Sequence, residues 1–257
     1  MNYGKSNLSR RKKRISSKKR MKKKRVGVRL FKAFVLCILL LGIVGVAAGG
    51  VFVKHVIDNT PEVTAKDILP QGYTTSIVDQ NGTVLEQLKD SDSNRVYKKY
   101  DEISKYMGDA FVAIEDERFY KHNGIDLQGI IRAGVVGVTH GFHFTEGAST
   151  LTQQLIKNLT QYDDVTVKRK VIEIFRALQF DKDYTKETTL EWYLNFIWLG
   201  DRCRGVGAAA MNYFGKPVQE LTLAECASLI SITNNPSAYN PYRYLENNQY
   251  RATLVLG

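Results

Sequence analysis

Hydrophobic and polar positions divide the chain into an apolar stretch near the N-terminus, a short alternating segment and a long region with helical spacing. Residues 33–53 include no charged side chain. As a helix that rises about 1.5 Å per residue, they would span about 31 Å, close to the hydrocarbon core of a bilayer. We therefore predict a transmembrane helix at 33–53. A cleaved signal peptide is the alternative, although its apolar region is usually only about 7–15 residues long.

Residues 54–100 are predicted to form a linker that contains a β-hairpin. The hairpin is expected at Thr74–Leu85, where β-branched residues flank Asn81-Gly82. This dipeptide favours the two-residue turn of a hairpin because both positions accept positive φ.

Helical spacing continues through 101–257, which predicts a mainly α domain with little strand. Apolar residues at i, i+3, i+4 and i+7 predict one buried helix face. They are Val171, Ile174, Phe175 and Leu178.

Two further patterns mark where helices are expected to begin and where a loop is expected. Thr188 with Glu191, and Thr222 with Glu225, have the spacing of capping boxes. The glycine-rich segment Gly134–Gly147 is expected to form a loop.

The positive charge lies almost entirely at the N-terminus. Residues 1–32 hold 15 of the 37 Lys and Arg residues and none of the 26 Asp and Glu residues. The positive-inside rule then predicts a basic cytoplasmic tail at 1–32 and an extracytoplasmic body. RNA binding by the tail is possible in principle, but attraction to anionic lipid headgroups is simpler next to a spanning helix. Since the body has no basic surplus, we expect no nucleic-acid partner.

The three cysteines do not form a disulfide framework. Cys37 lies within the predicted span, and Cys203 and Cys226 could pair in an oxidising compartment. We expect them to be free and structural.

Three carboxylates follow the apolar run Phe111–Ile114, namely Glu115, Asp116 and Glu117. A carboxyl group that leaves a buried wall and enters a cleft can act as a general base or acid. A solvated helix end is the alternative for such a charge cluster. Among the three, Glu115 is the candidate for the chemistry.

Two polar segments add to this candidate. Residues 147–158 are rich in hydroxyl and amide groups, which suit a sugar, and Lys157 can meet a phosphate. The alternative is a helix capped by Ser149 or Thr150. Further on, Arg169 and Glu173 share a helix face, either as a surface ion pair or as a second carboxylate beside a basic pair. Two carboxylates with cations near a phosphate leaving group would serve glycosyl transfer.

Together these segments resemble the five motifs of the family 51 peptidoglycan glycosyltransferases. That module occurs alone or at the N-terminus of class A penicillin-binding proteins. The motifs in this chain are Glu115-Asp116 with Phe119 and His122-Asn123-Gly124; Gly147–Gln154 with Lys157-Asn158; Arg169-Lys170 with Glu173; Lys186, Leu190 and Tyr193-Leu194-Asn195; and Gly200 with Gly205–Ala209 and Tyr213–Lys216.

The resemblance implies a lysozyme-like α fold and the polymerisation of lipid II into β-1,4 glycan strands. The reaction inverts the donor sugar and releases undecaprenyl pyrophosphate. Glu115 would be the base that deprotonates the 4-hydroxyl of the acceptor, and Glu173 the second essential carboxylate. The implied substrate-binding residues are Asp116, Phe119, His122, Gly124, Ser149, Thr150, Gln153, Gln154, Lys157, Asn158, Arg169, Lys170 and Asn195.

The resemblance implies no required cofactor and no metal-binding residues, with a divalent cation (Mg²⁺ or Mn²⁺) as an optional aid at the pyrophosphate. The implied partners are lipid II, the growing glycan strand and membrane lipid, with cell-wall or division proteins as further candidates. The transpeptidase combination of Ser-x-x-Lys with Lys-Thr-Gly is absent, since Lys-Thr-Gly does not occur and Ser-x-x-Lys occurs only in the basic tail. We expect a truncated bifunctional protein or an incomplete reading frame. A lytic muramidase and a non-catalytic scaffold that binds lipid II are the alternatives.

Overall fold

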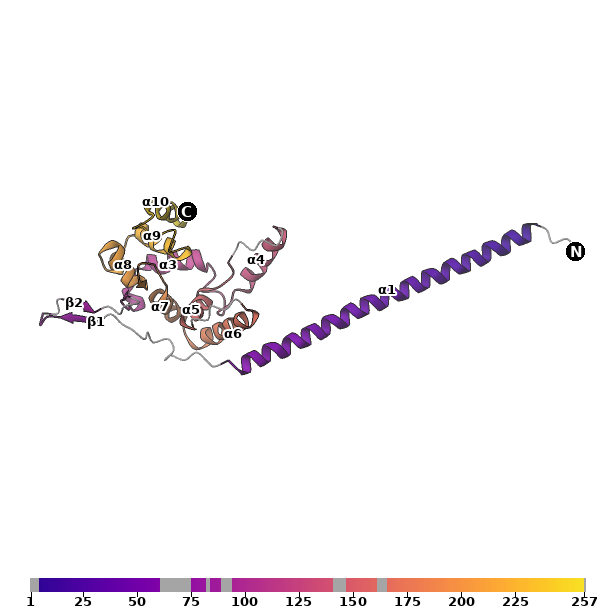
Figure 1. The fold of residues 1–257 in the computed structure, drawn as a ribbon, viewed down its shortest axis with the longest axis horizontal. Helices are drawn as coiled ribbons and strands as arrows, with labels where there is room; N and C mark the ends of the chain where they lie inside the picture. The colour runs from indigo at the N-terminus through magenta and orange to yellow at the C-terminus, as the bar shows by residue number, and fades with distance from the viewer. Residues whose placement is uncertain are drawn as a thin grey trace. The chain divides into compact units, whose positions relative to one another are not determined.

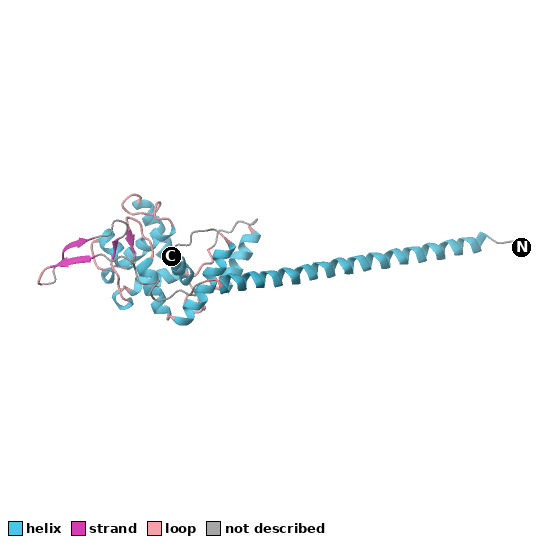
Figure 2. Ribbon diagram, turned by 60° about the horizontal axis from the view of Figure 1, so that its bottom comes forward, coloured by secondary structure: helices cyan, strands magenta, loops and turns pink. Residues whose placement is uncertain are grey.

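The computed structural model describes residues 5–60, 75–81, 84–88, 94–140, 147–160 and 166–256. Contacts divide the chain into two units, Met1–Asn59 and Thr60–Gly257 (Figure 1). Helices dominate the described residues, and the strands there form two small pairs (Figure 2). The mainly α class predicted from the sequence is confirmed.

The first unit is dominated by one long helix, α1 (Lys5–Asp58). Its segment Gly27–Asp58 is long and apolar enough to cross a membrane, and it includes the predicted span 33–53. The helix also continues through the described part of the basic tail. No proline interrupts the chain before Pro61, so α1 ends close to the first residue that disfavours a preceding helix.

Two local predictions for the second unit are confirmed. Strands β1 (Thr75–Val78) and β2 (Val84–Leu88) pair antiparallel as the expected hairpin, with an irregularity after Ile77. At the start of α9 (Leu223–Asn234), Thr222 and Glu225 form the predicted capping box, because each side chain accepts a hydrogen bond from the backbone of the other.

The rest of the second unit consists of short helices around one core. In chain order the elements are β3 (Asn94–Arg95), η1 (Tyr100–Glu102), α3 (Lys105–Glu115), α4 (Leu127–Thr139), α5 (Leu151–Thr160), α6 (Val167–Asp183), α7 (Lys186–Phe196), β4 (Cys203–Arg204), α8 (Val206–Phe214), η2 (Val218–Glu220), α9 (Leu223–Asn234) and α10 (Leu245–Leu256). Helix α5 packs against α6 and α7, and α9 packs against α3 and α10. The largest fully buried side chains include Met107, Phe111, Phe119 and Tyr193.

Three expectations about individual elements are wrong: the extent of a loop, the capping residue of α7 and the buried face of α6. The segment Gly134–Gly147 is not a loop throughout, because α4 continues to Thr139; residues 141–146 lie outside the described chain. A glycine within a helix costs only about 1 kcal/mol relative to alanine, so the apolar spacing of α4 prevails. Helix α7 is capped by Thr185 and not by Thr188, whose backbone N–H donates to the Thr185 side chain.

The buried face of α6 also differs from the predicted stripe. Leu178, one member of that stripe, is 41% exposed. The face that is buried instead carries Glu173, Arg176, Ala177 and Phe180. Hydrophobic spacing could not reveal this, because two of these residues are charged. Burial of Glu173 is compensated by hydrogen bonds from two cations, described below.

Candidate active site

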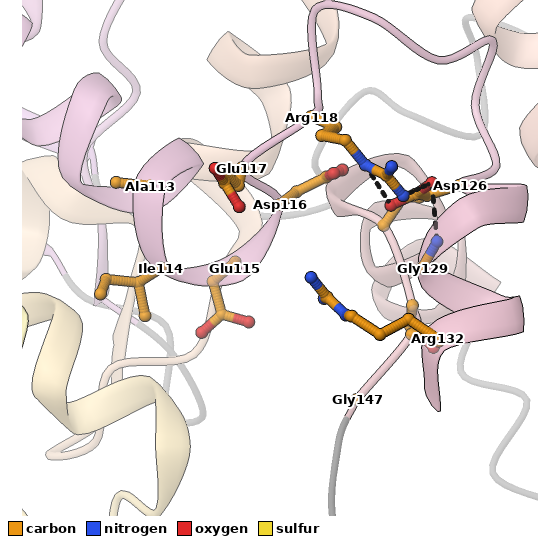
Figure 3. A pocket seen from close by; sticks show the side chains of 13 residues that line it. Ala113, Ile114, Glu115, Asp116, Glu117, Arg118, Asp126, Gly129, Arg132 and Gly147 are labelled. Atoms are coloured by element: carbon orange, nitrogen blue, oxygen red, sulfur yellow. Dashed lines mark hydrogen bonds and ion pairs between the residues drawn. The ribbon is translucent and has the colours of Figure 1, made fainter. Parts of the chain in front are cut away.

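Glu115 is the last residue of α3 and lines a cleft, called here the Glu115 cleft, with residues 113–118, 126, 129, 132 and 147–150 (Figure 3). Its Oε1 accepts a hydrogen bond from Thr233 Oγ1 at 3.0 Å, and its Oε2 accepts one from Gln154 Nε2 at 3.0 Å. A carboxylate can accept about four hydrogen bonds, so positions remain for a substrate hydroxyl. The arrangement gives a partly exposed carboxylate of fixed orientation, as a general base requires.

Gln154 is fixed in turn by Tyr193 of α7. The Tyr193 hydroxyl donates to Gln154 Oε1 at 3.1 Å, which directs the amide NH₂ group toward Glu115. The pKa of Tyr193 is raised well above its usual value of 10.0, mainly by burial and to a lesser extent by the negative charge of Glu115. Tyr193 is therefore protonated at neutral pH and acts as a hydrogen-bond donor.

Asp116 and His122 organise the protein beside the cleft. Both oxygens of Asp116 lie 2.9 Å from His122 Nε2, and Oδ2 also accepts the backbone N–H of Leu151 at 2.9 Å. The two side chains are nearly buried, at 3% and 8% exposure. They tie the end of α3 to the start of α5, and their predicted contact with substrate stays a prediction.

Phe119 and Gly124 have a packing role, and their predicted substrate contact stays a prediction. Phe119 is fully buried and meets the His122 ring edge-on. Gly124 has a φ of 81°, and a Cβ there would lie 2.3 Å from the carbonyl oxygen of Ala177. Only glycine lets α6 approach this closely.

Thr150, which lines the Glu115 cleft, and Gln153 are both nearly buried, each at 1% exposure, and their predicted substrate contact stays a prediction. The Thr150 backbone N–H donates to Gln153 Oε1 at 3.0 Å, and the Gln153 backbone N–H donates to Thr150 Oγ1 at 3.2 Å. Thr150 Oγ1 also donates to the Gly124 carbonyl at 2.6 Å. The pair is a capping box for α5, which agrees with the alternative weighed for this segment.

Asn195 is fully buried and binds backbone groups, and its predicted substrate contact stays a prediction. Its Oδ1 accepts the N–H of Lys98 at 2.8 Å, and its Nδ2 donates to the carbonyls of Lys98 and Glu191 at 2.7 Å each. The side chain thereby fastens the segment before η1 onto α7.

Glu173 forms a second charged cluster with Arg169 and Lys170. Arg169 Nη1 lies 2.7 Å from Glu173 Oε2, and Lys170 Nζ lies 2.5 Å from Oε1. Glu173 is 6% exposed, so this is a partly buried pairing rather than the surface ion pair considered above. The predicted cluster of one carboxylate and two cations is present.

Ser149 connects the two carboxylate sites. It lines the Glu115 cleft, and its Oγ accepts a hydrogen bond from Lys170 Nζ at 3.1 Å. Glu173 itself lines a separate pocket with Lys157 and Arg169. Asn158, next to Lys157 at the end of α5, is partly exposed.

The structure adds Thr233, Tyr193 and Arg132 to the predicted site residues. Arg132 of α4 lines the Glu115 cleft, and its guanidinium extends into it in Figure 3. Arg132 is the single charged residue of the apolar helix α4, and sequence inspection could have used this isolated charge to nominate it as a site residue. Thr233 gave no such signal, because it lies 118 residues from Glu115 and only folding brings them together.

Asp126 and Arg118 form an ion pair at the edge of the cleft (Figure 3). Asp126 also caps α4 by accepting the Gly129 N–H at 3.0 Å. Burial raises the pKa of Asp126, but the hydrogen bonds from Arg118 and Gly129 outweigh it and hold the pKa below the usual 3.8. Among the residues that the structure describes, no group of three or more His, Cys, Asp or Glu side chains could hold a metal ion.

Comparison with known proteins identifies the family of the chain. The family described as Transglycosylase matches residues 81–257. Penicillin-binding protein 1A of Clostridium perfringens (strain 13 / Type A) is 38% identical over 229 residues, which cover 84% of this chain and 34% of that protein. Penicillin-binding protein 1A/1B of Bacillus subtilis (strain 168) is 36% identical over 242 residues, which cover 94% and 26%.

The match to a crystal structure of penicillin-binding protein 1A from Haemophilus influenzae covers 73% of this chain and 18% of the crystallised chain. The sequence identity is 23% and the TM-score is 0.37. This chain thus spans about a third or less of the length of these relatives. The family match covers well over half of this chain and includes all five motifs. The chain therefore belongs to the transglycosylase family, and the resemblance predicted from its motifs is confirmed.

Proposed function

We propose that the domain at 101–257 polymerises lipid II into β-1,4 glycan strands, as a peptidoglycan glycosyltransferase. The observation that carries the proposal is the geometry of Glu115, which opens to a cleft while neutral donors hold both of its oxygens. Membership of the transglycosylase family supports the same reaction.

Glu115 acts as the base in this proposal. It removes the proton of the acceptor's sugar 4-hydroxyl, and the oxygen then attacks the anomeric carbon of the donor, the growing strand. The bond from that carbon to the pyrophosphate oxygen breaks, and undecaprenyl pyrophosphate leaves with the electron pair. Attack from the opposite face inverts the anomeric carbon.

The cations around Glu173 stabilise the leaving pyrophosphate. Lys170, Arg169 and Lys157 supply positive charge where negative charge develops. Glu173 orients the first two through its ion pairs, and Lys170 reaches toward the Glu115 cleft at Ser149. This supports a positioning role for Glu173 rather than a second base.

A divalent cation would depend mainly on the oxygens of the pyrophosphate. Asp116 is engaged by His122 and Asp126 by Arg118, so the described carboxylates at the cleft do not form a ligand set. The residues therefore do not fit a resident metal ion, and the proposed steps use none.

We also propose that Gly27–Asp58 crosses the membrane, with the basic tail in the cytoplasm and the domain outside. The length and apolar character of the helix support the span, and the Lys and Arg residues of 1–32 support the orientation. A spanning helix keeps the domain near a lipid-linked substrate, and anionic lipid would attract the tail.

The test is incubation of the full chain with labelled lipid II in detergent, with polymer length read by gel. We expect polymer from the wild type and none from Glu115→Gln. Glu246→Gln, an exposed substitution in α10, serves as the matched control and should polymerise normally. Release of fragments from finished cell wall without polymer would favour a muramidase, and binding without either product would favour a scaffold.

A further inference from the structure

The hydroxyl of Thr233 faces two groups that can each only accept a hydrogen bond. Its Oγ1 lies 3.0 Å from Glu115 Oε1 and 2.7 Å from the carbonyl oxygen of Ile230, in the last turn of α9. A threonine hydroxyl carries one hydrogen, whereas an ionised carboxylate and a carbonyl carry none to give. The hydroxyl can therefore donate to only one of the two neighbours at a time.

The donor to the other carboxylate oxygen of Glu115, Oε2, does not change partner in this way. Gln154 Nε2 donates to Oε2, and the protonated Tyr193 hydroxyl holds the amide in that orientation. The carboxyl group thus has one permanent donor and one donor that can turn away.

We propose that Thr233 is a positioning residue for Glu115 and that its hydroxyl changes acceptor during the reaction. It donates to Glu115 Oε1 while the carboxylate is ionised, and to the Ile230 carbonyl once Glu115 has taken the acceptor's proton. Thr233 keeps its own hydrogen throughout, so the only proton transferred is that of the substrate hydroxyl. This inference rests on the proposed role of Glu115 as the base.

The change of acceptor follows from the relative strength of the two hydrogen bonds. An ionised carboxylate is a stronger acceptor than a neutral carbonyl, so it attracts the hydrogen before proton transfer. After transfer Glu115 is neutral, and the nearer Ile230 carbonyl becomes the better partner. A rotation about the Cβ–Oγ1 bond suffices, and the partly buried hydroxyl is satisfied in both states.

Replacement of Thr233 removes none of the other titratable groups near Glu115. They are Asp116, Glu117 and Arg118, which follow Glu115 in the chain; Asp126 and Arg132, which line the same cleft; Lys170, which donates to Ser149; and Tyr193 of α7. A change in the pH dependence of a Thr233 variant can therefore be assigned to the missing hydroxyl.

The experiment compares Thr233→Val with Thr233→Ser by measuring the rate of lipid II polymerisation against pH. In Thr233→Val the ionised carboxylate loses a donor, so the acidic limb of kcat/KM should move upward by about one pH unit. Below the wild-type midpoint the rate should fall about tenfold, with a much smaller loss on the plateau and an unchanged KM. Thr233→Ser keeps the hydroxyl and should follow the wild-type profile.

Thr253→Val is the matched control. The Thr253 hydroxyl in α10 lies 2.7 Å from the Tyr250 carbonyl, the same contact that Thr233 makes with Ile230, and it is exposed. This variant should leave the pH profile unchanged. Thr233→Ala, measured in parallel, removes the hydroxyl without a branched side chain and should shift the profile in the same direction as valine.

Superposable profiles for wild type and the two hydroxyl-free variants would overturn the inference and leave the proposed function standing. If the wild type forms no polymer at any pH, the proposed function fails instead. In that case a ¹³C NMR titration of the Glu115 carboxyl group, assigned with Glu115→Gln, decides the inference. A higher midpoint in Thr233→Val supports the hydrogen bond to the ionised form, and an identical midpoint refutes it.

Discussion

Gly124→Ala tests whether the third residue of the His122-Asn123-Gly124 motif serves packing or substrate binding. The new Cβ would lie 2.3 Å from the Ala177 carbonyl oxygen and 2.8 Å from its carbon, both backbone atoms of α6. A left-handed φ of 81° adds about 1–2 kcal/mol for alanine. Displacement of a packed helix adds about 1–3 kcal/mol.

The substitution should therefore lower the free energy of unfolding by about 2–5 kcal/mol, a large fraction of the total of about 5–15 kcal/mol for a domain. The shift in melting temperature would be about 4–20 °C. The assay is urea and thermal unfolding of the full chain in detergent, followed by the fluorescence of Trp192 and Trp198. Gly134→Ala is the control, because nothing lies within 4 Å of its added Cβ and alanine favours the helix α4.

A Gly124→Ala protein as stable as the wild type would refute the packing argument. If that protein also showed a raised KM for lipid II, Gly124 would be a substrate contact, as the motif first implied. Equal destabilisation by Gly134→Ala would show that any added methyl group has this effect.

Three other substitutions give measurable outcomes. Glu173→Gln should reduce the rate of polymerisation at least about tenfold without loss of helical circular dichroism, because Lys170 loses its ionic partner; a rate near that of wild type would contradict the positioning role. Asn195→Ala should lower the free energy of unfolding by about 3 kcal/mol or more in urea, since three hydrogen bonds to backbone are lost; Asn247→Ala, which loses one exposed bond, should cost far less. The lowered pKa of Asp126 stabilises the folded protein above pH 3.8, and this stabilisation is lost as the pH falls through the pKa of the folded state. The free energy of unfolding should therefore fall less steeply with acidification in Asp126→Asn than in the wild type.

The sequence predicted those parts of the fold that depend on neighbouring residues. The hairpin follows from β-branched runs around Asn81, and the capping box at Thr222 follows from a hydroxyl three residues before Glu225. Both are local hydrogen-bond patterns, so no tertiary information was needed. The long apolar helix that includes 33–53 was equally predictable, because length and composition alone indicate it.

Tertiary packing decided what the sequence could not. Glu173 and Arg176 lie on the buried face of α6, where hydrophobic spacing would place apolar residues. Motif membership named both Gln153 and Gln154, but it could not show that Gln154 donates to Glu115 while the side chain of Gln153 turns inward. One position along a helix rotates a side chain by about 100°, which is enough to exchange a cleft for the core.

The contact between Thr233 and Glu115 has a consequence for the newly synthesised chain. The two residues are 118 positions apart, so at about 5–20 residues per second Glu115 is made roughly 6–24 s before its partner. Until α9 has been made, α3 lacks one of the helices that pack against it. A nascent chain of this protein therefore has Glu115 long before the site around it is complete, and in that interval its uncovered apolar surface favours aggregation.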